Sequence, residues 1–368
     1  MKPSLLVLHV LNELKHSGAE TMLYIAAPVF NAKGVQIEIL STGEQMGSYS
    51  PELFKAGCKL HHIPFSKSPK FFYKLYKLIR SGHYDVIHLH TERANFWIGL
   101  VALAARPAVV VKTIHSTFEF KGFLRIRRLV QRRILHFLGV VHVSISSSVQ
   151  ENELSNFGLR THLISNWYDD KRFQPVTNAA RKLARLNLGI SLQETVIVTV
   201  GNCSKIKNHA PLIQALALLP DAFRPIYLHV GGEEAGQPER ELAKALGIEG
   251  RVHFMGSVVD IKPALEASDI FVMPSLFEGF GISAIEALAM GLPAIFTEVP
   301  GLRDFRADFD GLYYSSPEVT SLLEALTVLL SESRETCLLR AKLYPEVTKR
   351  LYGVNRGVAG YIEVYRRN

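Results

Sequence analysis

The chain has 368 residues, of which 48% are hydrophobic and 21% are charged. This is the composition of a folded globular protein, and the length suits two domains better than one core. The formal net charge of +8 leaves nucleic acid, an anionic membrane surface or a phosphorylated substrate as partners. No segment approaches the roughly 20 apolar residues of a membrane span. The three cysteines, Cys58, Cys203 and Cys337, have no CxxC spacing, so neither a disulfide framework nor a zinc site is indicated.

Short apolar runs alternate with amphipathic stretches along the chain. In the first half, the runs predict strands at residues 5–11, 35–40, 86–89, 108–114 and 140–145. In the second half, they predict strands at residues 196–200, 225–230, 252–255, 270–274 and 294–297. Helical patterns fill most of the gaps. This alternation predicts an α/β protein with two doubly wound parallel sheets.

Turn residues gather between residues 165 and 175, among them Asn166, Asp169 and Pro175. We therefore place the domain boundary here, with residues 1–165 in a first domain and residues 166–351 in a second. Ligands of doubly wound sheets bind outside the carboxyl ends of the strands. The cleft between the two domains is the expected site. The first apolar run is too short for a signal peptide, so a cytoplasmic protein is expected.

The loop after the first predicted strand, residues 17–20, is Ser-Gly-Ala-Glu and opens a helix. It is not a GxGxxG fingerprint, which disfavours a dinucleotide-binding dehydrogenase. A loop of small residues at a helix N-terminus can still receive a phosphate, and Gly18 is a candidate for this contact. A plain strand-to-helix turn explains the loop equally well.

The most informative stretch is residues 270–293, IFVMPSLFEGFGISAIEALAMGLP. A predicted strand ends at Pro274, a loop with two glycines follows, and a short apolar helix ends at Gly291. Such a loop places free backbone N–H groups at a helix N-terminus, which suits phosphate or sugar oxygens.

Two carboxylates in this stretch, Glu278 and Glu286, stand eight residues apart. At about 1.5 Å rise per residue they lie roughly 12 Å apart. The two catalytic carboxyl groups of a glycoside hydrolase are only roughly 5–9.5 Å apart. We therefore expect Glu278 and Glu286 to bind the two ends of one extended ligand. Glu286 lies in an apolar run, where a buried carboxylate needs the hydrogen-bond donors that ligand hydroxyls supply. A surface helix with a solvated glutamate fits these neighbours less well.

This Glu-x7-Glu arrangement resembles the signature of glycosyltransferase family 4. It lies in Pro-Ser-x-x-Glu-Gly-Phe-Gly and continues as Glu-Ala-x-Ala-x-Gly-x-Pro. Further segments resemble the family at residues 85–90, 113–115, 143–144, 166–175, 252–256 and 267–269. The resemblance implies the GT-B fold, two Rossmann-like domains facing a cleft. It also implies a retaining, metal-independent sugar transfer, and a final helix, residues 352–368, that returns to the first domain.

The resemblance assigns roles to individual residues. Glu286 would bind the ribose hydroxyls of the nucleotide, and Glu278 would lie beside the donor sugar as a catalytic residue. The Gly18 loop would approach the diphosphate, and Met255 would meet the base through its backbone. The backbone N–H groups that would contact the sugar and diphosphate are those of Gly279, Phe280 and Gly281.

A loop that follows the predicted strand at residues 196–200 leads from Gly201 to Lys207 and a helix. A lysine beside a helix N-terminus can neutralise a diphosphate leaving group, although a solvated loop lysine would be the simpler explanation on its own. The family usually has Gly-Arg here, and Asn202 stands in place of the arginine. Gly201, Asn202 and Lys207 are predicted to bind the donor, and Lys205 or another base could offset the missing cation.

Three histidines lie in or directly after predicted strands. By resemblance, His115 would touch the donor sugar or help the acceptor hydroxyl lose its proton. His88 and His90 share one face of a strand, but no third ligand has supportive spacing, so we expect a structural role for both. Residues 308–310 spell the Asp-x-Asp of metal-dependent glycosyltransferases, but in an apparent loop, and so short a motif has little specificity. The prediction is an enzyme without a metal or other cofactor.

Residues 120–138 predict an amphipathic helix. One face carries the basic residues Lys121, Arg125, Arg128 and Arg132, and the other the apolar residues Phe123, Ile126, Val130, Ile134 and Phe137. The basic face fits an anionic membrane surface from which a lipid-linked acceptor could enter. A helix that packs on the core and leaves its basic face in solvent fits equally well. Aromatic residues interleaved for base stacking are not evident, so nucleic acid is not expected.

These patterns predict a glycosyltransferase that binds the acceptor in the first domain and the nucleotide-sugar donor in the second. The expected donor carries a hexose or N-acetylhexosamine, with uridine favoured over guanosine. The expected acceptor is a glycan or lipid-linked hydroxyl in surface-glycan synthesis, such as lipid-linked oligosaccharide, capsule or O-antigen. The protein would lie in the cytoplasm or peripherally on the inner face of the cell membrane. Two alternatives remain: a non-hydrolysing hexosamine 2-epimerase of the same fold, or a non-catalytic scaffold that binds a nucleotide sugar.

Overall fold

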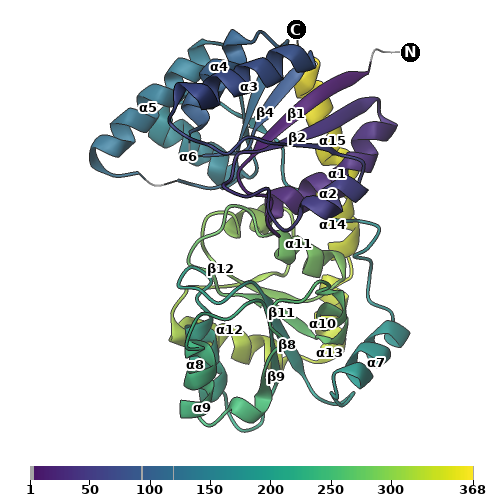
Figure 1. Ribbon diagram of the computed structural model, residues 1–368. Coiled ribbons are helices and arrows are strands. Elements are labelled where there is room, and N and C mark those ends of the chain that lie inside the picture. Colours follow the sequence, from purple (N-terminus) through teal and green to yellow (C-terminus); the bar gives the residue numbers. More distant parts are fainter. Residues whose placement is uncertain (1–3, 93, 119, 368) are drawn as a thin grey trace. The chain divides into compact units, whose positions relative to one another are not determined.

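The computed structural model describes residues 4–92, 94–118 and 120–367. The chain divides into two compact units. The first runs to Tyr168 and resumes at Tyr352, and the second comprises Asp169–Leu351. The expected boundary after residue 165 lies shortly before this break. Each unit is a parallel sheet with helices packed on it (Figure 1).

The sheet of the first unit has seven parallel strands in the order β3-β2-β1-β4-β5-β6-β7. They are β1 (Leu5–Leu11), β2 (Val35–Ser41), β3 (Lys59–His62), β4 (Val86–Leu89), β5 (Val109–Ile114), β6 (Val141–Ser144) and β7 (His162–Leu163). The helices are α1 (Gly18–Ala32), α2 (Ser50–Lys55), α3 (Pro69–Gly82), α4 (Asn95–Ala104), α5 (Gly122–Phe137), α6 (Ser147–Phe157) and α15 (Val354–Tyr365). Leu8, Val10, Ile87 and Leu89 of the central strands pack with apolar residues of α3 and α4 in one core.

The sheet of the second unit has six parallel strands in the order β10-β9-β8-β11-β12-β13. They are β8 (Val196–Val200), β9 (Ile226–Val230), β10 (Val252–Phe254), β11 (Ile270–Met273), β12 (Ala294–Thr297) and β13 (Tyr313–Ser315). The helices are α7 (Asn178–Asn187), α8 (His209–Leu218), α9 (Pro238–Ala245), α10 (Lys262–Ala267), α11 (Ile282–Ala289), α12 (Val319–Ser331), α13 (Arg334–Ala341) and α14 (Tyr344–Tyr352). In both units the first strand lies next to the second on one side and the fourth on the other. This is the order of a doubly wound, Rossmann-like sheet, and the predicted fold class is confirmed.

A carboxylate secures the amino end of the central strands in both units. Asp85, just before β4, accepts a hydrogen bond from the N–H of Leu6 at 2.8 Å. Asp269, just before β11, accepts one from the N–H of Val196 at 2.9 Å and pairs with the buried Arg185 guanidinium at 2.6 Å. Both aspartates belong to segments that resemble the family. They lie at the amino ends of the strands, whereas ligands of such sheets bind at the carboxyl ends.

All ten predicted strands form, and no end differs by more than one residue from its prediction. The structure adds β3, β7 and β13, which were not predicted. These lie at or beside the sheet edges, are two to four residues long, and are only partly buried. Edge strands face solvent along one side, so they carry little of the continuous apolar pattern that marks the interior strands.

Helix α15 comes last in the chain but packs in the first unit, beside α1 (Figure 1). Its Tyr365 hydroxyl lies 2.7 Å from Nδ1 of His88 on β4. Its Tyr361 hydroxyl lies 2.8 Å from Oγ1 of Thr113 on β5. These buried polar contacts fix the C-terminal segment against the carboxyl half of the central strands.

Helix α5 forms where it was predicted but presents the opposite face to the protein. Arg132 is 2% exposed, and its guanidinium pairs with Glu153 at 2.9 Å and Glu92 at 3.2 Å. Lys121 and Arg125 of the basic face are exposed. The whole apolar stripe is exposed as well: Phe123, Ile126, Val130, Ile134 and Phe137. The expectation of a core-packed apolar side is therefore wrong. The basic face is solvated only in part, because the carboxylates of Glu153 and Glu92 compensate the buried Arg132.

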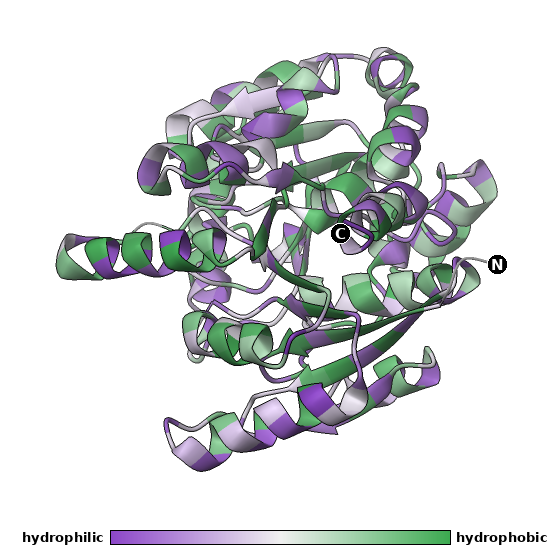
Figure 2. Cartoon of the chain, turned by 90° about the horizontal axis from the view of Figure 1, so that it is seen from above, coloured by the Kyte–Doolittle hydropathy of each residue, from purple (hydrophilic) through white to green (hydrophobic). Residues whose placement is uncertain are grey.

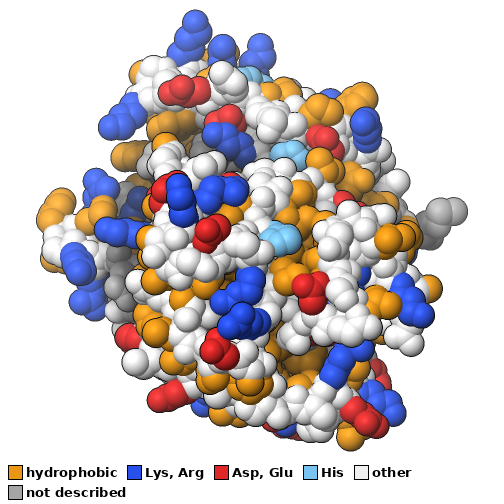
Figure 3. Space-filling model, turned by 90° about the horizontal axis from the view of Figure 1, so that it is seen from below, with side chains coloured by type: hydrophobic (Ala, Val, Ile, Leu, Met, Phe, Trp, Pro, Cys, Tyr) orange, Lys and Arg blue, Asp and Glu red, His pale blue; other side chains and the backbone are white. Residues whose placement is uncertain are grey.

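Hydrophobic and hydrophilic residues alternate along α5, which extends to the left in Figure 2. From below, apolar and basic side chains lie next to one another at this left edge (Figure 3). None of the helices in the described part of the chain has both the length and the apolar character needed to cross a membrane. Cys58, Cys203 and Cys337 are free thiols, as their spacing predicted.

Candidate functional site

The carboxyl ends of β8, β9 and β10 meet in closely packed glycine turns. The N–H of Gly231 donates to the carbonyl of Gly256 at 3.0 Å, and the N–H of Met255 donates to the carbonyl of His229 at 2.9 Å. Gly231 has a φ of 153°, and a Cβ there would lie 2.1 Å from the carbonyl oxygen of Gly201. Only glycine permits this backbone approach. The predicted donor residues Gly201 and Met255 therefore lie together at the carboxyl ends of the strands of the second sheet.

Asn202 has a structural role at this edge. Its Oδ1 accepts a hydrogen bond from the N–H of Gly232 at 2.7 Å and so fixes the turn after β9. The side chain supplies no positive charge where the family arginine would stand. Lys205, the first candidate to replace that charge, is exposed and has no hydrogen bond or ion pair with the described residues.

Lys207 and Glu278 form a close pair. The Nζ of Lys207 lies 2.6 Å from Oε1 of Glu278, and the hydroxyl of Ser275 donates to the same oxygen at 2.8 Å. The lysine chain passes over Gly201, where a Cβ would lie 3.2 Å from the lysine Cε. The structure thus brings together two of the three predicted catalytic residues. Glu278 is held by a cation and a hydroxyl rather than left free.

Hydrogen bonds to backbone carbonyls join the two loops that carry this pair. The N–H of Leu276 donates to the carbonyl of Ile206 at 2.7 Å. The amide Nδ2 of Asn208 donates to the carbonyl of Pro274 at 3.0 Å. The loop after β8 and the loop after β11 are therefore coupled at three points, counting the Lys207–Glu278 pair, which is a rigid support for charged groups.

Helix α11 begins at the end of the glycine loop. Gly281 caps it with a φ of 86°, which a residue with a side chain rarely adopts. Gly301, which the sequence analysis did not identify, has a φ of 87°, and a Cβ there would lie 2.6 Å from the carbonyl oxygen of Glu278. The ring of Phe280 is buried at 5.5 Å from that of Phe305, so its side chain belongs to the core. The backbone at Gly279 and Phe280 stays a predicted ligand contact.

Glu286 is only 7% exposed on α11, so the prediction of a buried carboxylate is confirmed. Its carboxyl group has no hydrogen bond or ion pair with the described residues. Burial raises the pKa of this carboxyl to about 8, and the Arg172 guanidinium opposes that rise. An unpartnered buried carboxyl is costly, so this position favours a ligand that brings hydrogen-bond donors.

The predicted phosphate loop lies in the first unit. Gly18 is exposed at the first residue of α1. The Ser17 hydroxyl donates to the carboxyl of Glu20 in the first helical turn. Glu20 is buried, and burial raises its pKa. An acidic side chain therefore already lies at this helix N-terminus, and a phosphate contact at Gly18 stays a prediction.

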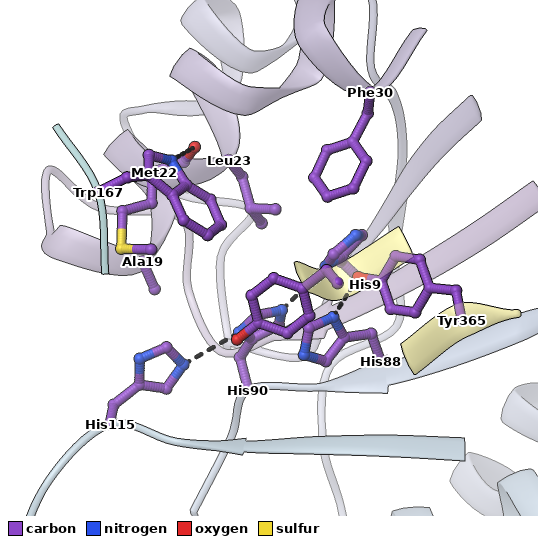
Figure 4. A pocket seen from close by; sticks show the side chains of 11 residues that line it. His9, Ala19, Met22, Leu23, Phe30, His88, His90, His115, Trp167 and Tyr365 are labelled. Carbon is purple, nitrogen blue, oxygen red and sulfur yellow. Dashed lines mark hydrogen bonds between the residues drawn. The ribbon is translucent and has the colours of Figure 1, made fainter. Parts of the chain in front are cut away.

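Histidines from three neighbouring strands meet in the first unit (Figure 4). Nε2 of His115, after β5, lies 3.0 Å from Nδ1 of His90, after β4. Nε2 of His90 lies 2.9 Å from Nδ1 of His9 on β1. Spacing along the sequence indicated no third ligand beside His88 and His90, but in the fold His9 lies next to both. The signal was the strand order, because β1 and β4 pair with His9 opposite His88.

His88 uses both of its ring nitrogens within the fold. Nδ1 lies 2.7 Å from the Tyr365 hydroxyl, and Nε2 lies 2.7 Å from Oγ1 of Thr113. The predicted structural role of His88 is confirmed by these contacts. Burial lowers the pKa of His9 to about 3 and that of His115 to about 4, so both are neutral at physiological pH.

The described residues contain one group of three metal-type side chains, His9, His88 and His90, whose ligand atoms lie within 4.8 Å of one another. The aspartates of the predicted Asp-x-Asp, Asp308 and Asp310, form no such group within the described part of the chain. In the second unit, Glu278, Glu286 and Lys207 thus offer hydrogen bonding and charge. In the first unit, His115 offers a hydrogen-bonding imidazole.

Two family models cover most of the chain. The model of Glycosyltransferase Family 4 matches residues 16–172, and that of Glycosyl transferases group 1 matches residues 181–349. EpsF of Bacillus subtilis, which is classed as a glycosyltransferase, is 30% identical over 311 residues, 79% of each chain. The chain belongs to glycosyltransferase family 4. The Lys207–Glu278 pair and Glu286 lie within the group 1 match, and the histidine group apart from His9 lies within the family 4 match.

Two further comparisons extend this assignment. The UDP-Gal:alpha-D-GlcNAc-diphosphoundecaprenol alpha-1,3-galactosyltransferase of Escherichia coli is 27% identical over 280 residues, 72% of this chain and 71% of that protein. The crystal structure of Anabaena HepE in complex with UDP and glucose matches with a TM-score of 0.81 at 20% identity. It covers 98% of this chain and 99% of HepE. This chain therefore has the GT-B fold, as its family predicts.

Proposed function

We propose that this glycosyltransferase moves a hexose or N-acetylhexosamine from a UDP-sugar to an acceptor hydroxyl, with retention of configuration and without a metal ion. Glu286 carries the proposal, because its buried carboxyl has no partner among the described residues. The two ribose hydroxyls of a nucleotide are donors that would satisfy it. The UDP bound by HepE and the UDP-galactose in the name of the E. coli relative support uridine.

The leaving diphosphate needs positive charge and hydrogen-bond donors. Lys207 is partly exposed beside Glu278 and would neutralise a phosphate oxygen. The loop N–H groups from Gly279 to Gly281 precede α11, and a helix N-terminus favours an anion. Glu278 would keep Lys207 in place while it accepts hydrogen bonds from the donor sugar. These groups supply the stabilisation that a divalent cation supplies in metal-dependent enzymes.

Retention would follow from approach of the acceptor on the face from which the diphosphate leaves. The acceptor oxygen would bond to the anomeric carbon as the bond from that carbon to the phosphate oxygen breaks. The hydroxyl proton would pass to the departing phosphate oxygen, which balances the transfer. Glu278 would act on the sugar hydroxyls instead of attacking the anomeric carbon, because Lys207 and Ser275 already occupy one of its oxygens.

The acceptor is proposed to be a lipid-linked glycan at an anionic membrane surface. The exposed apolar stripe of α5, with Phe123 79% and Phe137 89% exposed, would enter the interface. Lys121, Arg125 and Arg127 are exposed around it and would meet lipid phosphates. The undecaprenol-linked acceptor in the name of the E. coli relative supports this class of acceptor.

A binding panel tests the donor proposal. Isothermal titration with UDP, GDP and ADP should give the highest affinity for UDP. Glu286→Ala should weaken UDP binding at least tenfold, or about 1.4 kcal/mol. Glu335→Ala, which removes an exposed helical carboxylate, is the matched control and should not change affinity. Unchanged UDP affinity in Glu286→Ala would reject the site.

The epimerase alternative predicts a different reaction without acceptor. The protein is incubated with UDP-N-acetylglucosamine alone, and the nucleotide sugar is analysed by NMR. A transferase leaves the C2 configuration of the sugar unchanged, whereas an epimerase inverts it. Accumulation of the 2-epimer would overturn the proposed function.

A further inference from the structure

The three imidazoles of His115, His90 and His9 form one hydrogen-bonded chain that the proposed transfer does not yet use. The two links are 3.0 Å and 2.9 Å long. Each link joins one nitrogen of an outer ring to one nitrogen of His90, so both nitrogens of His90 are engaged. Figure 4 shows the rings in sequence, with His115 at the outer end and His9 deepest. His115 is partly exposed, and His9 is 1% exposed.

Burial keeps these rings neutral. It lowers the pKa of His9 to about 3 and that of His115 to about 4, and holds the pKa of His90 well below its usual value. Neighbouring histidines add to the effect at His90, while Glu92 opposes it at His115. A neutral imidazole has one N–H and one bare nitrogen. A hydrogen-bonded chain of neutral rings therefore has two self-consistent arrangements, with every N–H on Nδ1 or every N–H on Nε2.

The inner end of the chain distinguishes the two arrangements. Nε2 of His9 is buried and has no partner among the described residues. His9 lines a small pocket whose exposed lining surface is mostly apolar and includes Met22, Leu23 and Phe30. An N–H there would be an orphan donor in apolar surroundings, and orphan buried N–H groups are the rarer and costlier case. The favoured arrangement leaves Nε2 bare and places the hydrogen on Nδ1 of His9.

We propose that His9 and His90 are positioning residues that hold His115 as the Nδ1–H tautomer. His9 Nδ1–H donates to Nε2 of His90, and His90 Nδ1–H donates to Nε2 of His115. The remaining N–H of His115 is on Nδ1, which has no partner among the described residues. His115 then offers a sugar or phosphate oxygen a hydrogen-bond donor and not a base. This role toward substrate rests on the proposed function, but the tautomer does not.

The same side chains could be taken for a metal site, because His9, His88 and His90 approach within 4.8 Å. The hydrogen bonds favour the imidazole chain. Both nitrogens of His88 are engaged by Tyr365 and Thr113 at 2.7 Å each. A bound cation would have to break these contacts, as well as the His9–His90 link.

The decisive experiment is ¹⁵N NMR of histidine-labelled full-length protein at pH 7, which separates protonated from bare ring nitrogens and needs no activity. The expected result is hydrogen on Nδ1 and a bare Nε2 for His9, His90 and His115. Hydrogen on Nε2 of His115, or a charged ring, overturns the proposal. Stoichiometric Zn²⁺ binding that shifts the His9 and His90 nitrogens overturns it as well.

A matched pair of variants tests the positioning role. His9→Phe removes the inner end of the chain and should leave His115 as a mixture of tautomers. His142→Phe removes another buried histidine of the same sheet whose Nε2 also has no partner among the described residues, and should leave the His115 tautomer unchanged. An unaltered His115 tautomer in folded His9→Phe protein rejects the positioning role.

Kinetics test the role of His115 toward substrate. His115→Asn keeps a side-chain N–H and should retain kcat within about tenfold, whereas His115→Ala should lose about a hundredfold. Equal losses in the two variants overturn the donor role. Absence of sugar transfer by the unmodified protein would count against the proposed function alone, since the NMR result stands without it.

Discussion

At neutral pH the carboxyl of Glu286 holds a proton, because burial raises its pKa to about 8. Ribose hydroxyls donate to the carboxylate form, so UDP binding should lower this pKa and release up to one proton at pH 7. UDP affinity should then rise by up to about tenfold per pH unit and level off above pH 8. Titration calorimetry in two buffers of different ionisation enthalpy measures the release. Glu286→Gln is the control and should bind without it; proton uptake in the unmodified protein would contradict the assignment.

Lys207 and Lys205 are neighbours in one loop with different environments. Lys207 pairs with Glu278 at 2.6 Å, whereas Lys205 is exposed. Lys207→Met should lower kcat about 10²–10³-fold, the usual cost of one group that stabilises transition-state charge. Lys205→Met should have little effect on steady-state kinetics with a UDP-sugar. A comparable loss in Lys205→Met would show instead that Lys205 replaces the family arginine missing at Asn202.

At the scale of elements, the glycine turn after β12 supports the loop after β11. Gly301 has a φ of 87°, and a Cβ there would lie 2.6 Å from the Glu278 carbonyl oxygen. Gly301→Ala should therefore displace Glu278, lower the melting temperature and weaken donor binding. Gly250→Ala is the matched control in the same unit, because a Cβ there meets nothing within 4 Å. Thermal unfolding with and without UDP measures both effects; equal behaviour of the two variants would exclude this support.

The exposed stripe of α5 makes a prediction about membrane binding. Phe123→Ser with Phe137→Ser should reduce sedimentation with vesicles of anionic phospholipid severalfold, because both rings would leave the interface. Replacing Lys121, Arg125 and Arg127 by Gln should also reduce it, most strongly at low salt. Arg132 is left intact, since its buried ion pairs stabilise the unit. Leu183→Ser removes an exposed apolar residue of α7 and serves as the control. Sedimentation unaffected by both α5 variants would reject the membrane surface.

Sequence patterns predicted most strands of both sheets, but not the side-chain contacts between different helices and strands. The ten predicted strands, nine interior strands and the edge strand β10, carry short apolar runs, so each was found. The inward face of α5 was not, because Arg132 is compensated by Glu153 and Glu92, which spacing along one helix does not reveal. His9 was missed for a similar reason, since its contact with His90 depends on strand order. The burial of Glu286 was predictable because its neighbours form an apolar run. Its role and that of Lys207 toward a donor stay predictions.

For the whole molecule, the net charge of +8 says less about partners than its magnitude implies. Part of the positive charge is internal, since Arg132 and Arg185 are buried in ion pairs. On the face seen from below, Lys and Arg are dispersed and lie beside Asp and Glu instead of forming one continuous patch (Figure 3). This face therefore lacks the continuous stripe of positive charge that long polyanions require (Figure 3). The proposed reaction uses only a few basic side chains: Lys207 at the diphosphate, and Lys121, Arg125 and Arg127 on or beside α5.

These basic groups also lead to a prediction about the metal dependence and stereochemistry of the complete reaction. If Lys207 and the N–H groups before α11 stabilise the leaving diphosphate, transfer from a UDP-sugar should continue in excess EDTA at close to its full rate. The new glycosidic bond should keep the anomeric configuration of the donor, which proton NMR of the product determines from the first turnovers. Added Mg²⁺ or Mn²⁺ should change kcat less than twofold. A rate that falls with EDTA and recovers with Mn²⁺ would show that a metal ion, and not Lys207, neutralises the leaving diphosphate. An inverted product would show that the acceptor attacks from the opposite face of the sugar.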